Sequence, residues 1–251
     1  NFEEILHAAD GIMVARGDMG VEVAYEKLPG IQKRFIRRCV QSGKIVITAT
    51  QMLESMISSP VPTRAEITDV ANAVFDGTSA VMLSGETAAG NYPVEAVTTM
   101  ARIAEQAEND MMRVSTFARE MVWHEMDALD VTNAIAHAAS TLAQDIKAGA
   151  IMAVTKTGYT AGRMAKFRPD TLIIGASPYE KTYHQMSLLW GVYPIRSDYR
   201  REIEDCMENY ASKAIAAGII KEGDKLVVTA GLPVDEKGNT NLIRVITAER
   251  S

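Results

Sequence analysis

Three short runs rich in valine, isoleucine and methionine recur in the first hundred residues, and each run ends in small and polar side chains. The runs lie in the segments GIMVARGDMG, KIVITATQMLES and SAVMLSGETAAG, which begin at Gly11, Lys44 and Ser79. Aligning Ala15–Asp18 with Ala49–Met52, and that segment with Leu83–Glu86, gives a repeat of 34 residues in both intervals. One strand, one loop and one helix fit this length, so the pattern predicts three β/α units with a parallel sheet.

Amphipathic segments separate these runs, and we expect helices over residues 31–40, 63–75 and 93–107. The second has the clearest start, because Pro60-Val61-Pro62 opposes a continuing helix and Thr63 and Glu66 have the spacing of a capping box. The helical period predicts that this helix buries a stripe made of Ile67, Val70, Ala71 and Val74.

Polar side chains lie where each predicted strand ends: Arg16 and Asp18, Thr48 and Thr50, Ser84 and Glu86. Because the carboxyl ends of parallel strands meet on one face, we expect these groups to share a site. We expect the first strand, around Ile12–Val14, to be buried on both faces. Three units do not close an eight-stranded barrel, so a barrel would need strands from outside this chain.

The residue types at these strand ends suit metal and anion binding. Asp18 is a candidate magnesium ligand, although a carboxylate beside a glycine also serves as a simple helix or turn cap. Gly17 allows a substrate carboxylate or phosphate to approach the backbone. The side chains of Thr50, Ser84 and Glu86 are suited to positioning a substrate or relaying a proton, with purely structural roles as the alternative.

A second α/β pattern follows the repeat. We expect a first domain over residues 1–110, a connector over 111–128 and a smaller open α/β domain over 129–251. The second domain should begin with a helix over 131–147 that buries Ile135, Ala138, Ala139 and Leu142. Short buried runs predict a mostly parallel sheet with strands at 150–154, 171–175, 193–195, 225–230 and 241–247.

One loop of the second domain is a candidate phosphate site. Hydroxyls and glycines between a strand and a helix can cradle a phosphate. Here the candidate residues are Thr155, Lys156, Thr157, Gly158 and Thr160. An ordinary capped turn between a strand and a helix explains the same residues, so a phosphate site and a purely structural turn both remain hypotheses.

Composition and charge limit the classes of protein to which this chain can belong. The net charge of −6 disfavours a nucleic-acid binder, and no apolar run approaches the roughly 18 residues of a membrane span. Cys39 and Cys206, the only cysteines, lie in helix-like segments and read as buried thiols of a cytoplasmic protein. The chain begins with Asn1 already in helical periodicity, which suggests a polypeptide that has been cut.

Several long motifs together resemble the pyruvate kinase family. They are MVARGDMGVE, ATQMLESMI, PTRAEITDVANAVFDG and MLSGETAAGNYPVEAV, followed by TAGLPV and GNTNLIRV. The resemblance covers essentially the whole chain but only about the C-terminal half of a family member. It implies an α/β fold made of the last three β/α units of a TIM barrel, followed by the smaller open α/β domain.

The resemblance also implies a function. The family transfers a phosphoryl group from phosphoenolpyruvate to ADP, giving pyruvate and ATP, with Mg²⁺ or Mn²⁺ and K⁺. By the matching motifs, Asp18 is implied as the metal ligand and the backbone at Gly17 as the binding site of the substrate carboxylate. Thr50 is implied near the enolate carbon, and Ser84 and Glu86 in the network that protonates it.

The resemblance carries expectations about assembly and completeness as well. Family members are usually cytoplasmic homotetramers, and some bind a phosphorylated effector, although Tyr159 stands where sugar-phosphate-activated members often carry a basic residue. The catalytic lysine, the second metal carboxylate and the potassium ligands are implied to lie upstream, so this chain alone is expected to be inactive. The alternative is a non-catalytic regulatory or assembly module on the same fold.

Overall fold

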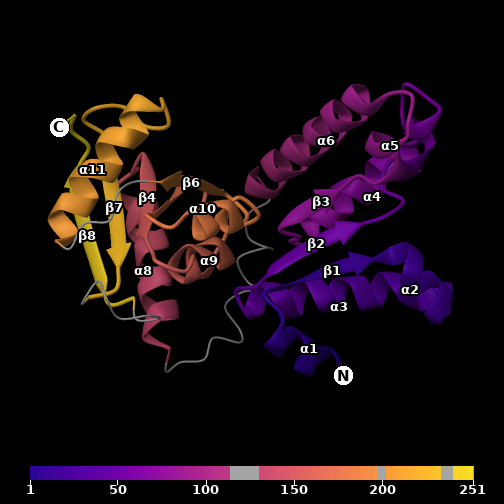
Figure 1. Ribbon diagram of the computed structural model, residues 1–251, viewed down its shortest axis with the longest axis horizontal. Coiled ribbons are helices and arrows are strands. Elements are labelled where there is room, and N and C mark those ends of the chain that lie inside the picture. The colour runs from indigo at the N-terminus through magenta and orange to yellow at the C-terminus, as the bar shows by residue number, and fades with distance from the viewer. Residues whose placement is uncertain (114–129, 197–201, 233–239, 251) are drawn as a thin grey trace. The chain divides into compact units, whose positions relative to one another are not determined.

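The computed structural model describes residues 1–113, 130–196, 202–232 and 240–250, and the chain divides into two compact units (Figure 1). The first unit spans Asn1–Ala118 and the second Arg119–Ser251. Residues 114–128 of the expected connector lie outside the described residues. Residues 111–113, which we also expected in the connector, instead form the last turn of a long helix, α6.

The first unit is built on a three-stranded parallel sheet in the order β1-β2-β3, which confirms the predicted repeat. The strands are β1 (Gly11–Ala15), β2 (Ile45–Ala49) and β3 (Ala80–Met82). The helices are α1 (Phe2–Ala8), α2 (Arg16–Glu22), α3 (Leu28–Gln41), α4 (Arg64–Phe75), α5 (Gly85–Ala88) and α6 (Pro93–Arg113), with short 3₁₀ turns η1 (Tyr25–Lys27) and η2 (Glu54–Ile57). Ala15 is in register with Ala49, and Ala49 with Met82, so the three strands end level with one another.

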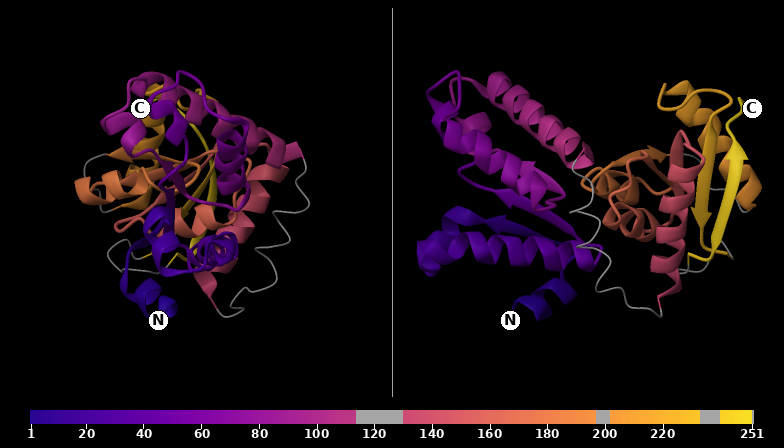
Figure 2. Two further views of the ribbon diagram at one scale, coloured as in Figure 1. Left: turned by 90° about the vertical axis from the view of Figure 1, so that its right-hand side faces the viewer. Right: turned by 180° about the vertical axis from the view of Figure 1, so that it is seen from behind.

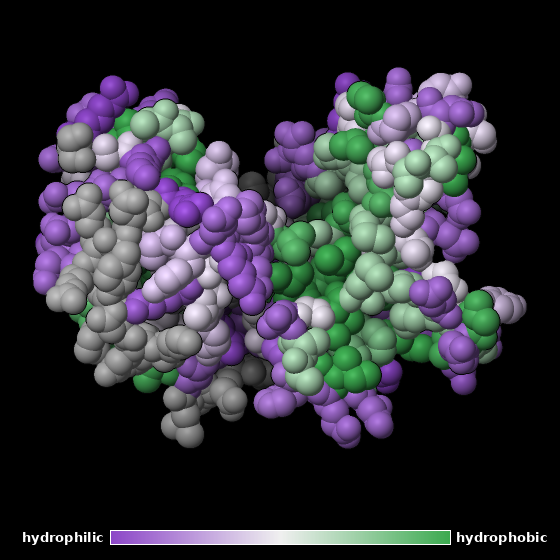
Figure 3. Space-filling model, viewed as in Figure 1, coloured by the Kyte–Doolittle hydropathy of each residue, from purple (hydrophilic) through white to green (hydrophobic). Residues whose placement is uncertain are grey.

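Strand β1 is buried on one face only, which corrects the expectation of burial on both. Val14 is fully buried against Ile36, Cys39 and Val46, because helix α3 lies along this face of the sheet (Figure 2, right). The preceding residue, Met13, lies on the other face and is 51% exposed. Figure 3 shows hydrophobic side chains at the surface in the region of the sheet β1-β2-β3.

Helix α4 begins as predicted but buries a different stripe. Thr63 is its N-cap, and the capping box with Glu66 is complete. Of the expected stripe, Val70 and Val74 are buried, whereas Ile67 is 40% exposed and Ala73 is buried instead. The buried face of α4 differs from the expected one because the helix packs against helix α6 and the loop after β2. These elements share one core that includes Met52, Leu53, Met56, Ala96 and Met100.

The second unit contains the predicted open, mostly parallel sheet. Its strands are β4 (Ala150–Val154), β5 (Ile173–Ser177), β6 (Val192–Arg196), β7 (Lys225–Ala230) and β8 (Leu242–Thr247), in the order β6-β5-β4-β7-β8. Strands β4, β5, β6 and β7 pair in parallel, and β8 pairs antiparallel with β7. The helices are α8 (Val131–Asp145), α9 (Tyr159–Lys166), α10 (Glu180–Met186) and α11 (Ile203–Ala216).

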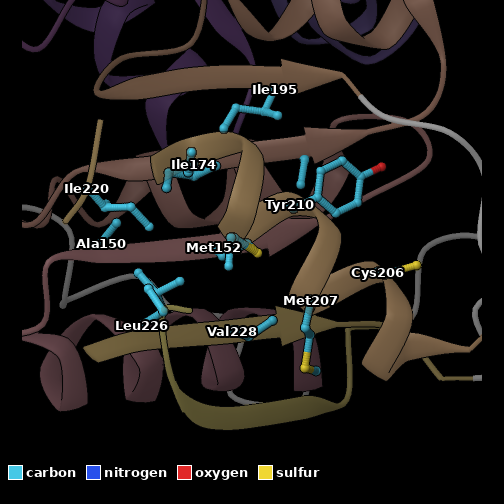
Figure 4. Close-up of a cluster of buried hydrophobic side chains, with 14 of the residues drawn as sticks. Ala150, Met152, Ile174, Ile195, Cys206, Met207, Tyr210, Ile220, Leu226 and Val228 are labelled. Carbon is cyan, nitrogen blue, oxygen red and sulfur yellow. The ribbon is translucent and has the colours of Figure 1, made fainter. Parts of the chain in front are cut away.

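Alternate strand residues supply a separate core on each face of this sheet. Met152 and Val228 pack with Met207 and Tyr210 of helix α11 (Figure 4). Ile151 and Val227 of the same strands pack with alanines of helix α8, namely Ala136, Ala139 and Ala143. The prediction for α8 was therefore right for Ala139 and wrong for Ala138, which is exposed. Small alanines favour this face because they let the helix lie close to the sheet.

Both cysteines are buried, as the sequence indicated. Burial raises the pKa of the Cys39 thiol to about 11. A thiol with so high a pKa stays protonated near neutrality, which agrees with a structural cysteine. Among the described helices, none is long and apolar enough to cross a membrane.

Candidate active site

The loop that follows strand β2 has a strained backbone. Thr50 and Gln51 have φ values of 67° and 54°, in the left-handed region that non-glycine residues avoid. A side chain branched at Cβ, such as that of Thr50, is disfavoured there even more. Such conformations cost roughly 1–3 kcal/mol per residue and persist only where surrounding contacts hold them.

The side chain of Arg16, the first residue of α2, lies against this loop and is 8% exposed. Its Nη2 donates hydrogen bonds to the carbonyl oxygens of Thr50 (2.6 Å) and Gln51 (3.0 Å), and its Nε to those of Thr50 (3.1 Å) and Ala49 (3.3 Å). Its Nη1 forms an ion pair with Asp69 of α4 at 2.5 Å. One guanidinium therefore connects the end of β1, the loop after β2 and helix α4.

The structure brings Gly17 and Thr50 together where strands β1 and β2 end. The Gly17 N–H donates to Thr50 Oγ1 at 2.8 Å, and that hydroxyl donates to the carbonyl oxygen of Ala49 at 2.7 Å. A Cβ added at Gly17 would lie 3.6 Å from Thr50 Oγ1, so the two residues are in direct contact. The pair places the Thr50 hydroxyl beside the half-buried backbone of Gly17 at the carboxyl end of the sheet.

Asp18 follows directly and is exposed. Within the described part of the chain it takes part in no hydrogen bond or ion pair, which leaves both carboxylate oxygens open to a ligand. Magnesium is commonly bound through one or two carboxylates together with water and substrate oxygens, so the chemistry of Asp18 fits one ligand of such a site. Over residues 1–113, 130–196, 202–232 and 240–250, no group of three or more His, Cys, Asp or Glu side chains converges on a metal position.

Glu86, by contrast, is 3% exposed and fully engaged with the backbone. Its Oε1 accepts a hydrogen bond from the Leu53 N–H at 3.0 Å, and its Oε2 one from the Ser84 N–H at 2.7 Å. The carboxylate thus joins the loop after β2 to the loop after β3. Through these bonds it fixes the backbone that carries Ser84.

A third acidic side chain, Glu66 of α4, holds the same loop farther along. It accepts hydrogen bonds from Ser55 N (2.7 Å) and Ser55 Oγ (2.5 Å), and from Thr63 N (2.7 Å) and Thr63 Oγ1 (2.9 Å). Burial alone would raise the pKa of Glu66, but these hydrogen bonds outweigh burial and hold its pKa below the ordinary value. Charge-assisted bonds of this kind favour the ionised form.

We expect Glu66→Gln to lower the free energy of unfolding by about 1–2 kcal/mol at pH 7, because it removes the charge from the capping box and from the bonds to Ser55. Since folding lowers the pKa, the carboxylate stabilises the fold above its unfolded pKa of about 4.3 and this contribution is lost as the pH falls through the folded pKa. Urea unfolding at pH 7 and pH 3.5 measures both effects. A variant that lost the same stability at both pH values would contradict the role of the charge.

The predicted phosphate loop lies between β4 and α9. Two of its hydroxyls bond within the protein: Thr155 Oγ1 accepts from the Gly158 N–H at 3.0 Å, and Thr160 Oγ1 lies 2.8 Å from Thr240 Oγ1. Gly158 has a φ of 83°, which explains the glycine at the start of α9. Thr157 is exposed, so its side chain is accessible to a ligand.

The sequence placed Arg16 among the polar side chains at the strand ends but did not show that Arg16 holds the loop after β2. It also did not indicate that Glu66 binds this loop or that Asp69 pairs with Arg16. One signal was present, because Glu66 and Asp69 lie three residues apart and therefore share a helix face. That face turns toward the loop, and the helical pattern alone did not specify this direction.

The chain matches known proteins along most of its length. Residues 1–97 match the family described as pyruvate kinase, barrel domain, and residues 133–246 match pyruvate kinase, alpha/beta domain. Pyruvate kinases of Clostridium acetobutylicum and Sporosarcina psychrophila are 46% and 47% identical over 249 and 248 residues, covering 99% and 98% of this chain. The crystal structure of a pyruvate kinase from Cryptosporidium parvum superposes with a TM-score of 0.90 at 38% identity, over 99% of this chain.

The matches cover only part of each relative: 52% of the Clostridium protein, 41% of the Sporosarcina protein and 49% of the Cryptosporidium chain. The chain therefore spans about half the length of these relatives. Both family domains occur in it in the order that the motifs predicted. The chain belongs to the pyruvate kinase family and comprises part of its barrel domain together with its alpha/beta domain.

Proposed function

We propose that the complete polypeptide containing these residues is a pyruvate kinase that transfers a phosphoryl group from phosphoenolpyruvate to ADP, giving pyruvate and ATP. One observation carries the proposal. At the level ends of the parallel strands, the Gly17 N–H binds the Thr50 hydroxyl beside Asp18, whose carboxylate is exposed and has no partner in the described chain. An open carboxylate beside the Gly17–Thr50 contact suits a reaction that depends mainly on positioning and charge neutralisation.

Each residue of the site has a role in this proposal. Asp18 would hold Mg²⁺ or Mn²⁺, which supplies charge neutralisation at the transferred phosphoryl group. The backbone around Gly17 binds the substrate carboxylate, and Thr50 lies toward the enolate carbon. Ser84 belongs to the network that delivers a proton to that carbon, and Glu86 shapes the network by fixing the Ser84 backbone.

The assay is pyruvate formation from phosphoenolpyruvate and ADP by the complete polypeptide, with and without Mg²⁺ and K⁺. We expect activity that requires both ions, and no activity from residues 1–251 alone, because the resemblance places the catalytic lysine, the second metal carboxylate and the potassium ligands upstream. A complete polypeptide that binds neither substrate would favour the non-catalytic assembly module. We further propose a cytoplasmic homotetramer.

The proposal extends to a phosphorylated effector at the loop between β4 and α9. Thr157→Ala should raise the effector concentration for half-maximal response about tenfold or more, because a hydrogen bond to a charged group contributes roughly 1.5–3 kcal/mol. Thr160→Ala is the structural comparison, since its hydroxyl already bonds Thr240 and its loss should mainly lower stability. The effector site is tested by measuring the activity of each variant at increasing concentrations of inorganic phosphate and of a panel of sugar phosphates. An unaltered response in Thr157→Ala would reject the site.

A further inference from the structure

The left-handed backbone at Thr50 and Gln51 sits where the proposed substrate binds. Among the described residues, four non-glycine positions have positive φ values: Thr50, Gln51, Lys147 and Arg168. Thr50 and Gln51 are the consecutive pair in this set, and one of them is branched at Cβ. Two adjacent disfavoured residues require a specific contact that holds them.

We propose that Arg16 is the positioning residue that holds this backbone and thereby directs the Thr50 hydroxyl. This inference rests on the proposed function only in assigning Thr50 to the substrate site. Arg16 itself is buried beneath the loop, so it acts through Thr50 and not on the substrate.

The geometry of the contact suits arginine in particular. The carbonyl oxygens of Ala49, Thr50 and Gln51 all lie within hydrogen-bonding distance of one guanidinium group. A planar fork with five N–H donors can bond several oxygens at once, whereas a lysine ammonium is a compact point charge on a flexible stem. The remaining guanidinium nitrogen, Nη1, donates a hydrogen bond to the Asp69 carboxylate at 2.5 Å. This ion pair orients the guanidinium and compensates its charge.

Thr50 is thereby held from two sides by neighbouring residues of one segment. The Arg16 side chain binds its carbonyl oxygen, and the Gly17 N–H binds its hydroxyl. Because residues 16 and 17 are adjacent, a movement of this segment shifts both contacts together. Losing the guanidinium should let Thr50 and Gln51 relax toward ordinary φ values and carry the hydroxyl away from Gly17.

The test is a double-mutant cycle in the complete polypeptide, with Arg16→Gln, Gln51→Gly and the pair. We expect Arg16→Gln to lower kcat about a hundredfold with a smaller change in KM, since small displacements of positioning groups have effects of this size. Gln51 is exposed, and glycine adopts a positive φ without penalty. Gln51→Gly should therefore recover about tenfold of the loss in the pair while changing the parent little. Effects that simply add in the pair would overturn the proposal.

A second measurement does not depend on catalysis. The ¹³Cα and ¹³Cβ chemical shifts of Thr50 report its backbone conformation and should move toward ordinary values in Arg16→Gln. Unchanged shifts would overturn the proposal even if activity fell. If Arg16→Gln does not fold, Arg16→Lys replaces it, because lysine keeps the charge but lacks the planar guanidinium. The same chemical shifts of Thr50 are then measured in Arg16→Lys. Full turnover in Thr50→Ala would contradict the proposed role of Thr50 in catalysis. The chemical shifts of Thr50 in Arg16→Gln would then decide by themselves whether Arg16 holds the backbone.

Discussion

Asp18→Ala should lower kcat/KM for magnesium-dependent pyruvate formation by about three orders of magnitude in the complete polypeptide. The carboxylate is exposed, has no partner in the described chain and follows the Gly17–Thr50 contact. A metal that neutralises developing charge is worth several kcal/mol in the transition state, and about 4 kcal/mol corresponds to a thousandfold change in rate. Steady-state kinetics at a series of Mg²⁺ concentrations measures the effect.

Glu22→Ala provides the matched control, because Glu22 is an exposed carboxylate on the same short helix, α2. We expect it to leave kcat/KM within about twofold, in keeping with a solvated surface position. Binding of Mn²⁺, followed by electron paramagnetic resonance, separates a lost cation from a damaged fold. Near-normal turnover and Mn²⁺ binding in Asp18→Ala would defeat the assignment of Asp18 as a metal ligand.

Glu86→Ala should lower the free energy of unfolding by about 2–6 kcal/mol. The change removes the acceptor for two backbone N–H groups, those of Leu53 and Ser84, at a position that is 3% exposed. Each buried donor left without an acceptor costs about 1–3 kcal/mol. Thermal unfolding should show a melting temperature lower by about 2–4 °C for each kcal/mol lost, for a domain of about 150–250 residues.

Two companion variants interpret this result. Glu86→Gln keeps the shape and one carbonyl oxygen, so its loss should be smaller than that of Glu86→Ala. Glu105→Ala removes an exposed carboxylate from helix α6 and should change stability by no more than about 0.5 kcal/mol. If Glu86→Ala matched Glu105→Ala, the two backbone bonds would not stabilise the loops as the structure suggests.

Local patterns predicted the architecture well. The 34-residue repeat located three parallel strands, and the capping box at Thr63 marked the start of α4. In the second unit, strands β4 and β7 have the predicted boundaries, because buried apolar runs between turn residues leave few alternatives. Strand β5 begins two residues later than predicted, at Ile173, since Thr171 and Leu172 read as part of the same apolar run.

Helix faces were predicted less well. Ile67 and Ala138 fit the helical period but are exposed, whereas Ala73 and Ala136 are buried. Periodicity identifies an apolar stripe but does not choose among neighbouring alanines and valines. The partner surface makes that choice, through how closely the helix can approach the sheet or a second helix.

The chain's own sequence determined the order of strands and helices and the placement of Gly17, Asp18, Thr50 and Ser84 at strand ends, because these depend on residues close together along the chain. Only the tertiary structure decided what holds Thr50. Arg16 and Asp69 lie 34 and 19 residues away from it along the chain, and they meet at the loop because parallel pairing makes the strands end level. A backbone that is unfavourable by itself is stable there because one guanidinium, fixed by distant elements, binds its carbonyl oxygens.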